Sequence, residues 1–122
     1  MSESACKISW GAMRIRQQRE FQRLFRSGKK GRSGPLNVHI HPTDSICSRM
    51  GLAVGRRVGG AVRRNRVKRL LRTTFRSLHN DWPETLDVIV IVHPHDPASI
   101  DSYRSWMDEA VQKAMRASRD SA

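Results

Sequence analysis

Basic side chains are concentrated in residues 56–76, where their types and spacing favour the binding of a polyanion. A glycine pair precedes a segment with helical periodicity, and the start of a helix offers N–H groups and partial positive charge to a phosphate. Arginine adds planar, paired donors. A charged face that is merely solvated usually carries charges of both signs. This segment carries almost only positive charge, because Asp81 is the only acidic residue between Arg49 and Glu84. The candidate binding residues are Arg56, Arg57, Arg63, Arg64, Asn65, Arg66, Lys68, Arg69, Arg72 and Arg76.

The whole chain shares this charge. In 122 residues, Lys and Arg total 23 against 11 Asp and Glu, which gives a formal charge of +12 and a pI near 11.3. Such an excess repels itself in a folded chain, so we expect a polyanionic partner, nucleic acid first and an anionic membrane surface second. A membrane surface requires large apolar residues open to lipid, whereas expected strands flank this segment and would cover its apolar side.

The remaining composition predicts a cytosolic protein. Residues 1–13 contain no apolar stretch typical of a secretory signal, and no apolar run approaches the roughly 20 residues of a membrane helix. Cys6 and Cys47 match no metal-ligand spacing. A disulfide between them stays open as an alternative, although reduced thiols are expected in the cytosol.

Other side-chain chemistry has little support in the sequence. Two His-x-His pairs lie at the ends of expected strands beside prolines, and no third ligand stands at metal-binding spacing. The acidic residues are scattered, so we expect neither a carboxylate cluster for Mg²⁺ nor an acid–base pair. No catalytic or metal-binding residue is therefore assigned. The two pairs are His39/His41 and His93/His95.

Periodicity and turn residues predict elements in the order α-β-β-α-β-α. Residues 29–34 are expected to form a basic Gly/Ser loop. The order predicts an α+β fold, a single-domain α-β sandwich with helices on a mixed sheet, over residues 14–117. A disordered tail is expected at 1–13 and a frayed end at 118–122. The expected helices are 16–27, 61–78 and 100–116, and the expected strands are 36–40, 50–54 and 86–92.

The expected helix at 61–78 has two distinct faces. At about 100° per residue, mostly apolar side chains fall on one side and arginines gather on the other. The first side suits a core, and the second suits an anion. The core side consists of Val67, Leu70, Leu71, Thr74 and Leu78. The basic side consists of Arg66, Arg69, Arg72 and Arg76.

The segment from Gly59 to Arg72 resembles the signature of the bacterial ribonuclease P protein family, Gly-x-Ala-Val-x-Arg-Asn-Arg-x-Lys-Arg-x-x-Arg. The central triplet of this signature is Arg64-Asn65-Arg66 here. The resemblance extends over most of residues 14–117. It implies an α-β sandwich whose βαβ unit has an uncommon left-handed crossover, where the ordinary chirality rule predicts a right-handed one.

The resemblance also implies a division of labour. In the family, a partner RNA carries the catalytic centre and holds Mg²⁺, while the protein binds that RNA and the 5′ leader of precursor tRNA. The protein is then a monomeric, non-catalytic subunit of an endoribonuclease, and the basic residues named above contact RNA. Phe21, Phe25 and His39 match positions that line the leader cleft. His39 stands where the family often has tyrosine, and core packing is the alternative for both phenylalanines.

A second function stays open beside this one. A ribosomal or architectural protein that binds nucleic acid without associated catalysis would need the same basic surface and the same small core. Composition does not separate the two functions. The length of the signature favours the ribonuclease P subunit.

Overall fold

The computed structural model describes residues 18–44 and 47–120 and has an α+β architecture. The order of elements is α-β-β-β-α-β-α, so the predicted fold class is confirmed and the predicted order gains one strand. The helices are α2 (Gln18–Ser27), α3 (Ala61–Leu78) and α4 (Ile100–Asp120). The strands are β1 (Lys29–Ser33), β2 (Leu36–Pro42), β3 (Arg49–Val54) and β4 (Leu86–Val92). Two short 3-10 helices flank α3, namely η2 (Arg56–Val58) and η3 (His79–Asp81).

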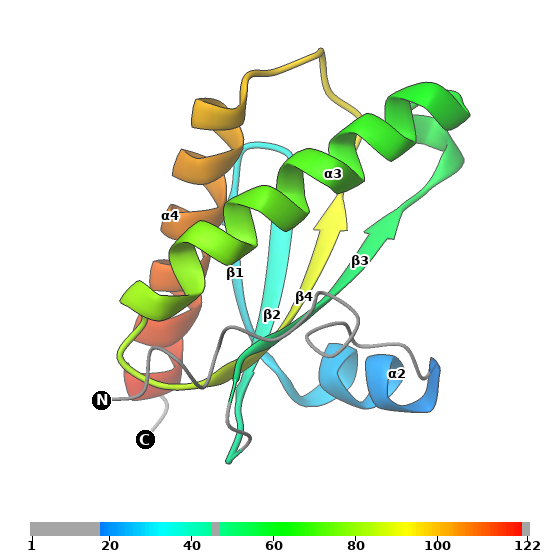
Figure 1. The fold of residues 1–122 in the computed structure, drawn as a ribbon. Helices are drawn as coiled ribbons and strands as arrows, with labels where there is room; N and C mark the ends of the chain where they lie inside the picture. The colour runs from blue at the N-terminus through cyan, green and yellow to red at the C-terminus, as the bar shows by residue number, and fades with distance from the viewer. Residues whose placement is uncertain (1–17, 45–46, 121–122) are drawn as a thin grey trace.

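The four strands form one mixed sheet in the order β1-β2-β4-β3. β2 pairs antiparallel with β1 and with β4, whereas β3 and β4 run parallel. Parallel neighbours need a crossover, which α3 provides. In Figure 1 the arrows of β3 and β4 point upward, α3 lies in front of the sheet, and β4 lies to the left of β3. The crossover is therefore left-handed, as the resemblance implied, in contrast to the common right-handed form.

The two faces of the sheet carry different layers. Leu36, Val38 and Ile40 of β2 belong to the main core, together with side chains of α3 and α4. His39 points to the other face, because successive side chains of a strand alternate. On that face Phe25 of α2 stacks on the His39 ring. β4 is buried along nearly its whole length, which confirms the prediction from its β-branched run.

The predicted loop at residues 29–34 is wrong, because most of this segment forms the edge strand β1. Its sequence has little β propensity, and pairing with β2 and packing against α4 stabilise it instead. Gly31 approaches α4 so closely that an added Cβ would lie 2.0 Å from the carbonyl oxygen of Ala110. Gly34, with a φ of 54°, and Pro35 close the hairpin to β2 in a two-residue loop.

One helix boundary differs from the prediction, and another lies outside the described residues. α4 continues to Asp120 instead of ending at Arg116, into a segment predicted to be frayed. Residues 117–120 contain no Gly or Pro that would end the helix. The predicted helix start at Arg16 and the predicted tail at residues 1–13 lie outside the described residues.

α3 has the predicted bounds and, with two differences, the predicted core side. Phe75 was not assigned to that side, yet it is fully buried and packs on Trp82 with ring centroids 5.7 Å apart. Leu70 was assigned to it, yet it lies at the edge and is partly exposed. The buried residues of α3 are Val67, Leu71, Thr74, Phe75 and Leu78. None of the helices in the described ranges is long and apolar enough to cross a membrane.

Candidate nucleic-acid interface

The start of α3 is open to solvent and carries no neutralising charge. Gly60 precedes the helix and contributes no side-chain cap, and the first turn contains no acidic residue. The first helical hydrogen bond runs from the N–H of Arg64 to the carbonyl of Gly60 at 2.9 Å. The N–H groups of residues 61–63 therefore have no partner within the helix and add to the positive potential of the arginines.

The structure separates the ten predicted binding residues into two groups. The exposed residues are Arg56, Arg57, Asn65, Arg66, Arg69 and Arg76, and we call the four of them on α3 the basic face of α3. The partly buried residues are Arg63, Arg64, Lys68 and Arg72. They flank the buried side of the helix, because each lies three or four residues, about one helical turn, before a buried residue. The structure thus leaves the exposed group best placed to contact a large polyanion.

Two of the partly buried arginines also have internal roles or unsatisfied atoms. Arg63 donates a hydrogen bond to the carbonyl of His95 and so joins α3 to the loop before α4. The Nε atoms of Arg63 and Arg64 are buried and have no hydrogen-bond partner in the described part of the chain.

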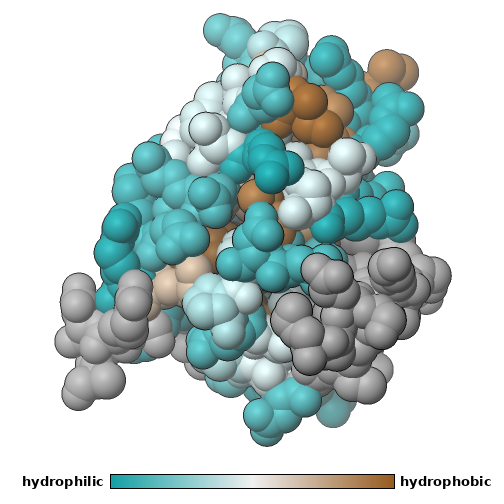
Figure 2. All heavy atoms as spheres, turned by 60° about the vertical axis from the view of Figure 1, so that its left-hand side comes forward, coloured by the Kyte–Doolittle hydropathy of each residue, from teal (hydrophilic) through white to brown (hydrophobic). Residues whose placement is uncertain are grey.

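Figure 2 shows the side of the molecule on which α4 comes forward. Apolar surface interrupts the hydrophilic residues on this side.

A second cationic surface lies on the opposite face of the sheet, along the β1–β2 hairpin. Lys30 and Arg32 of β1 lie beside Asn37 and His39 of β2, and these four residues line a cavity of about 270 Å³ that we call the hairpin groove. Lys30 pairs with His39 and Arg32 pairs with Asn37, so all four side chains share one face. Phe25 is 44% exposed and stacks on His39, with ring centroids 4.6 Å apart and an interplanar angle of 22°.

His39 is a buried polar group at this groove. The residue is only 4% exposed, and its Nδ1 atom has no hydrogen-bond partner among the described residues. The Oδ1 atom of Asn37 is in the same situation. Burial lowers the pKa of His39, nearby Lys30 lowers it further, and a hydrogen bond to the backbone of Phe25 opposes both effects. Buried polar atoms without partners destabilise a fold and are expected where a ligand binds.

The structure brings together two of the three residues predicted for a leader cleft. Phe25 and His39 form the stack at the hairpin groove. Phe21 belongs to α2, but its side chain lies outside the described part of the structure. Three polar residues of the groove were not predicted. Two of them lie in residues 29–34, which were expected to form a loop, and the third lies on the predicted strand 36–40 beside His39. These residues are Lys30, Arg32 and Asn37.

One histidine of each His-x-His pair has a local partner. His95 Nε2 lies 2.6 Å from the hydroxyl of Tyr103, and His41 Nδ1 lies 2.8 Å from the carbonyl oxygen of Pro42. Within residues 18–44 and 47–120, no group of three His, Cys, Asp or Glu could hold a metal ion. Cys47 is buried, and Cys6 lies outside the described residues.

The lowered pKa of His39 predicts that acid destabilises the fold. The unfolded chain has the ordinary histidine pKa of 6.5, so below that pH it binds more protons than the folded chain. This contribution to stability is present above pH 6.5 and is lost as the pH falls through the folded-state pKa. Burial also lowers the pKa of His79, opposed by Asp81, and adds a contribution of the same sign.

We expect His39→Phe, which keeps an aromatic ring against Phe25, to reduce the loss of stability on acidification. The measurement is the free energy of unfolding in urea between about pH 7 and pH 5. His79→Phe is the matched variant, and it should remove the part of the pH dependence that comes from His79. An unchanged pH dependence in His39→Phe would show that His39 titrates normally in the folded protein.

A basic helix on one face of a mixed sheet and a cationic, aromatic groove on the other are features of a small nucleic-acid-binding protein. Comparison with known proteins narrows this class. The sequence model of the Ribonuclease P family matches residues 11–115. The chain belongs to this family.

Individual relatives agree with the family match. The chain is 38% identical to the ribonuclease P protein component of Oceanobacillus iheyensis over 79 residues, which cover 64% of this chain and 65% of the relative. It is 34% identical to that of Shouchella clausii over 103 residues, which cover 83% of this chain and 84% of the relative. The solved RNase P protein of Thermotoga maritima is 27% identical, has a TM-score of 0.68, and is matched over 84% of this chain and 96% of its own.

Proposed function

We propose that this protein is the non-catalytic protein subunit of ribonuclease P. In this role it binds the catalytic RNA and the 5′ leader of precursor tRNA and assists the endonucleolytic removal of that leader. The match to the Ribonuclease P family over residues 11–115 carries the proposal. The ribonucleoprotein then acts in the cytoplasm and contains one copy of this protein.

Two separate surfaces support two separate RNA contacts. The basic face of α3 lies on one side of the sheet, and the hairpin groove lies on the other. A protein with this arrangement can hold two RNA segments at once. The catalytic RNA is assigned to α3, because a row of exposed arginines suits an extended phosphate backbone.

The hairpin groove is assigned to the single-stranded leader. Phe25 presents part of an aromatic face on which an unpaired base can stack, a contact of roughly 1–3 kcal/mol per base that tolerates any sequence. Lys30 and Arg32 lie beside it and can neutralise the leader phosphates. The unpartnered atoms of Asn37 and His39 offer hydrogen bonds to the same strand.

Mg²⁺ is assigned to the RNA and the substrate, because the described residues provide no cluster of metal ligands. The protein contributes positive charge where two RNA backbones approach each other. Such charge reduces the repulsion between phosphates, so less Mg²⁺ is required to assemble the complex. The protein therefore matters most when Mg²⁺ is scarce.

Cleavage of a 5′-labelled precursor tRNA by the cognate ribonuclease P RNA at low Mg²⁺ tests this proposal. We expect the wild-type protein to restore cleavage at the mature 5′ end. Replacing both Arg66 and Arg69 with alanine should abolish the restoration, whereas Arg116→Ala on α4 should retain it. No restoration by the wild-type protein, with salt-sensitive RNA binding still present, would instead indicate a general nucleic-acid-binding protein.

A further inference from the structure

An apolar pocket lies between the first half of α3 and the loop that leads to α4. It has a volume of about 570 Å³, which falls within the roughly 300–1,000 Å³ of sites that bind small ligands. Its walls include Val67 and Leu70 of α3, Pro97 and Ala98 of the loop, and Tyr103 of α4. These residues make most of the pocket apolar. We call it the α3–α4 pocket.

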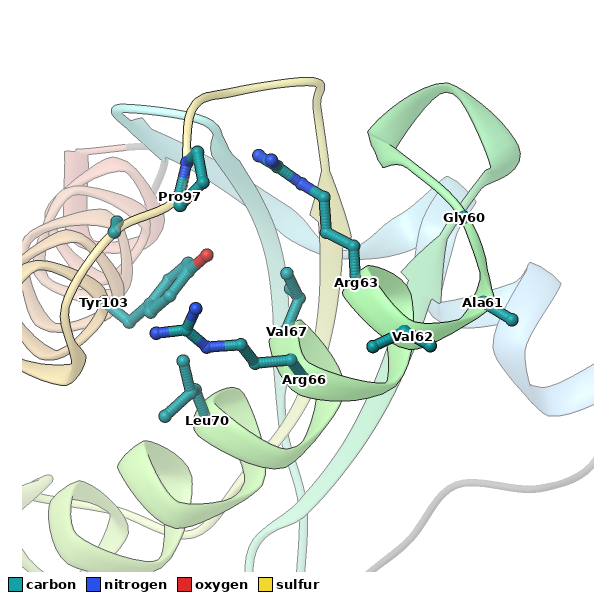
Figure 3. A pocket seen from close by; sticks show the side chains of 10 residues that line it. Gly60, Ala61, Val62, Arg63, Arg66, Val67, Leu70, Pro97 and Tyr103 are labelled. Carbon is teal, nitrogen blue, oxygen red and sulfur yellow. The ribbon is translucent and has the colours of Figure 1, made fainter.

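Two arginines reach over this apolar surface. Figure 3 shows the guanidinium of Arg66 between Tyr103 and Leu70, while Arg63 extends toward the loop. Burial raises the pKa of Tyr103, and both arginines are close enough to oppose that effect. The residues that line the pocket, all within the described part of the chain, include no acidic side chain. The pocket therefore combines apolar walls with an uncompensated positive rim.

A pocket with apolar walls and a positive rim favours a ligand that has a flat apolar group with a negative charge next to it. A nucleobase has two apolar faces and is joined to an anionic phosphate on each side. The guanidinium of Arg66 is planar and can stack on such a base, while its hydrogen-bond donors reach a neighbouring phosphate. An aliphatic side chain of a protein partner would fill the apolar walls but would provide no negative charge for the two guanidinium groups.

We propose that the α3–α4 pocket holds one unpaired nucleobase of the RNA that binds along α3. The proposal rests on the proposed function, and it adds a base-binding site to a surface that otherwise contacts only phosphates. Continuity supports it, because Arg66 belongs both to the basic face of α3 and to the pocket rim. An RNA backbone lying along α3 would pass directly beside the opening.

A second copy of this chain is a weaker candidate for the same pocket. Val62 is 86% exposed and Ile100 is 40% exposed, so two apolar side chains are available near this region for contact between copies. However, each copy carries a formal charge of +12, and the pocket rim is itself cationic. Two such surfaces repel each other, whereas RNA neutralises them.

Filling the pocket without changing the charge tests the proposal. Ala98→Trp places a large ring in the pocket, and Val62→Trp does so from an exposed position that cannot disturb the core. Ile100→Trp is the matched control, because Ile100 is partly exposed and does not line the pocket. Each protein is bound to the cognate ribonuclease P RNA, and dimethyl sulfate and carbodiimide report the accessibility of every unpaired base.

We expect the wild-type protein and the Ile100→Trp control to protect one unpaired nucleotide of the RNA from these reagents. Both filled variants should leave that nucleotide reactive and bind the RNA roughly tenfold more weakly. The thermal unfolding of Val62→Trp should be unchanged, because Val62 is exposed, whereas Ala98 packs against the core. Base reactivities and affinities equal to those of the wild type in a folded filled variant would overturn the pocket proposal alone.

Two other outcomes also overturn it and differ from the first. If the wild-type protein neither binds this RNA nor restores cleavage at low Mg²⁺, the proposed function and the pocket proposal fail together. If the filled variants bind RNA normally but self-associate differently from the control in sedimentation velocity, the pocket belongs to an interface between copies of this chain.

Discussion

Gly31→Ala should lower the free energy of unfolding by about 3 kcal/mol, because the new methyl group would meet backbone atoms that cannot move independently. The added Cβ would lie 2.0 Å from the carbonyl oxygen of Ala110 and 2.7 Å from the amide nitrogen of Ala114. Both atoms belong to α4, so the helix would have to shift away from β1 as a unit. Denaturation in urea measures the loss of stability directly.

The same variant should also weaken leader binding, since β1 carries two cations of the hairpin groove, Lys30 and Arg32. Gly55→Ala is the matched control, because nothing lies within 4 Å of a Cβ added there. If Gly31→Ala is as stable as Gly55→Ala, α4 is not seated on β1 as the structure describes. The edge strand would then depend on pairing with β2 alone.

Reversing two charges on the basic face of α3 should reduce affinity for ribonuclease P RNA by at least about 100-fold. Arg69 and Arg76 are both exposed on the side of α3 that faces away from the core, so their replacement by glutamate leaves the fold intact. Each lost charge-assisted contact to a phosphate is worth roughly 1.5–3 kcal/mol, and the added carboxylates repel the RNA. Binding isotherms at several salt concentrations supply the measurement.

The salt dependence distinguishes local contacts from overall charge. Loss of two phosphate contacts should reduce the slope of log affinity against log salt by about two. Reversal of Arg104 and Arg116 on α4 changes the net charge by the same amount and should alter the affinity only slightly. Equal losses in the two double variants would mean that net charge, and not the basic face of α3, determines binding.

Several features of the protein were predictable because they depend on neighbours in the sequence. The helix at Ala61–Leu78 was predicted with its observed bounds, since a glycine pair precedes it and its apolar spacing has a helical period. β4 was predicted from a continuous β-branched run, which is typical of a strand buried on both faces. The excess of arginine likewise indicated a polyanionic partner, and the resemblance of residues 59–72 to the ribonuclease P signature implied that this partner is RNA.

Other features depend on contacts between residues distant in the chain, and local sequence patterns do not reveal such contacts. β1 has a weak strand sequence and forms because β2 pairs with it and α4 packs against Gly31. Because β1 was not predicted, the hairpin groove and the neighbours of His39 on β1 could not be predicted either.

The division of the α3 arginines into exposed and partly buried groups was also decided by packing, since the sheet and α4 determine which side of α3 is covered. Local spacing therefore determined which segments are helix or strand and where the charge lies. Tertiary contacts determined which of those charges meet an aromatic ring, a pocket or solvent, because burial depends on what packs against a residue and not on the residue alone.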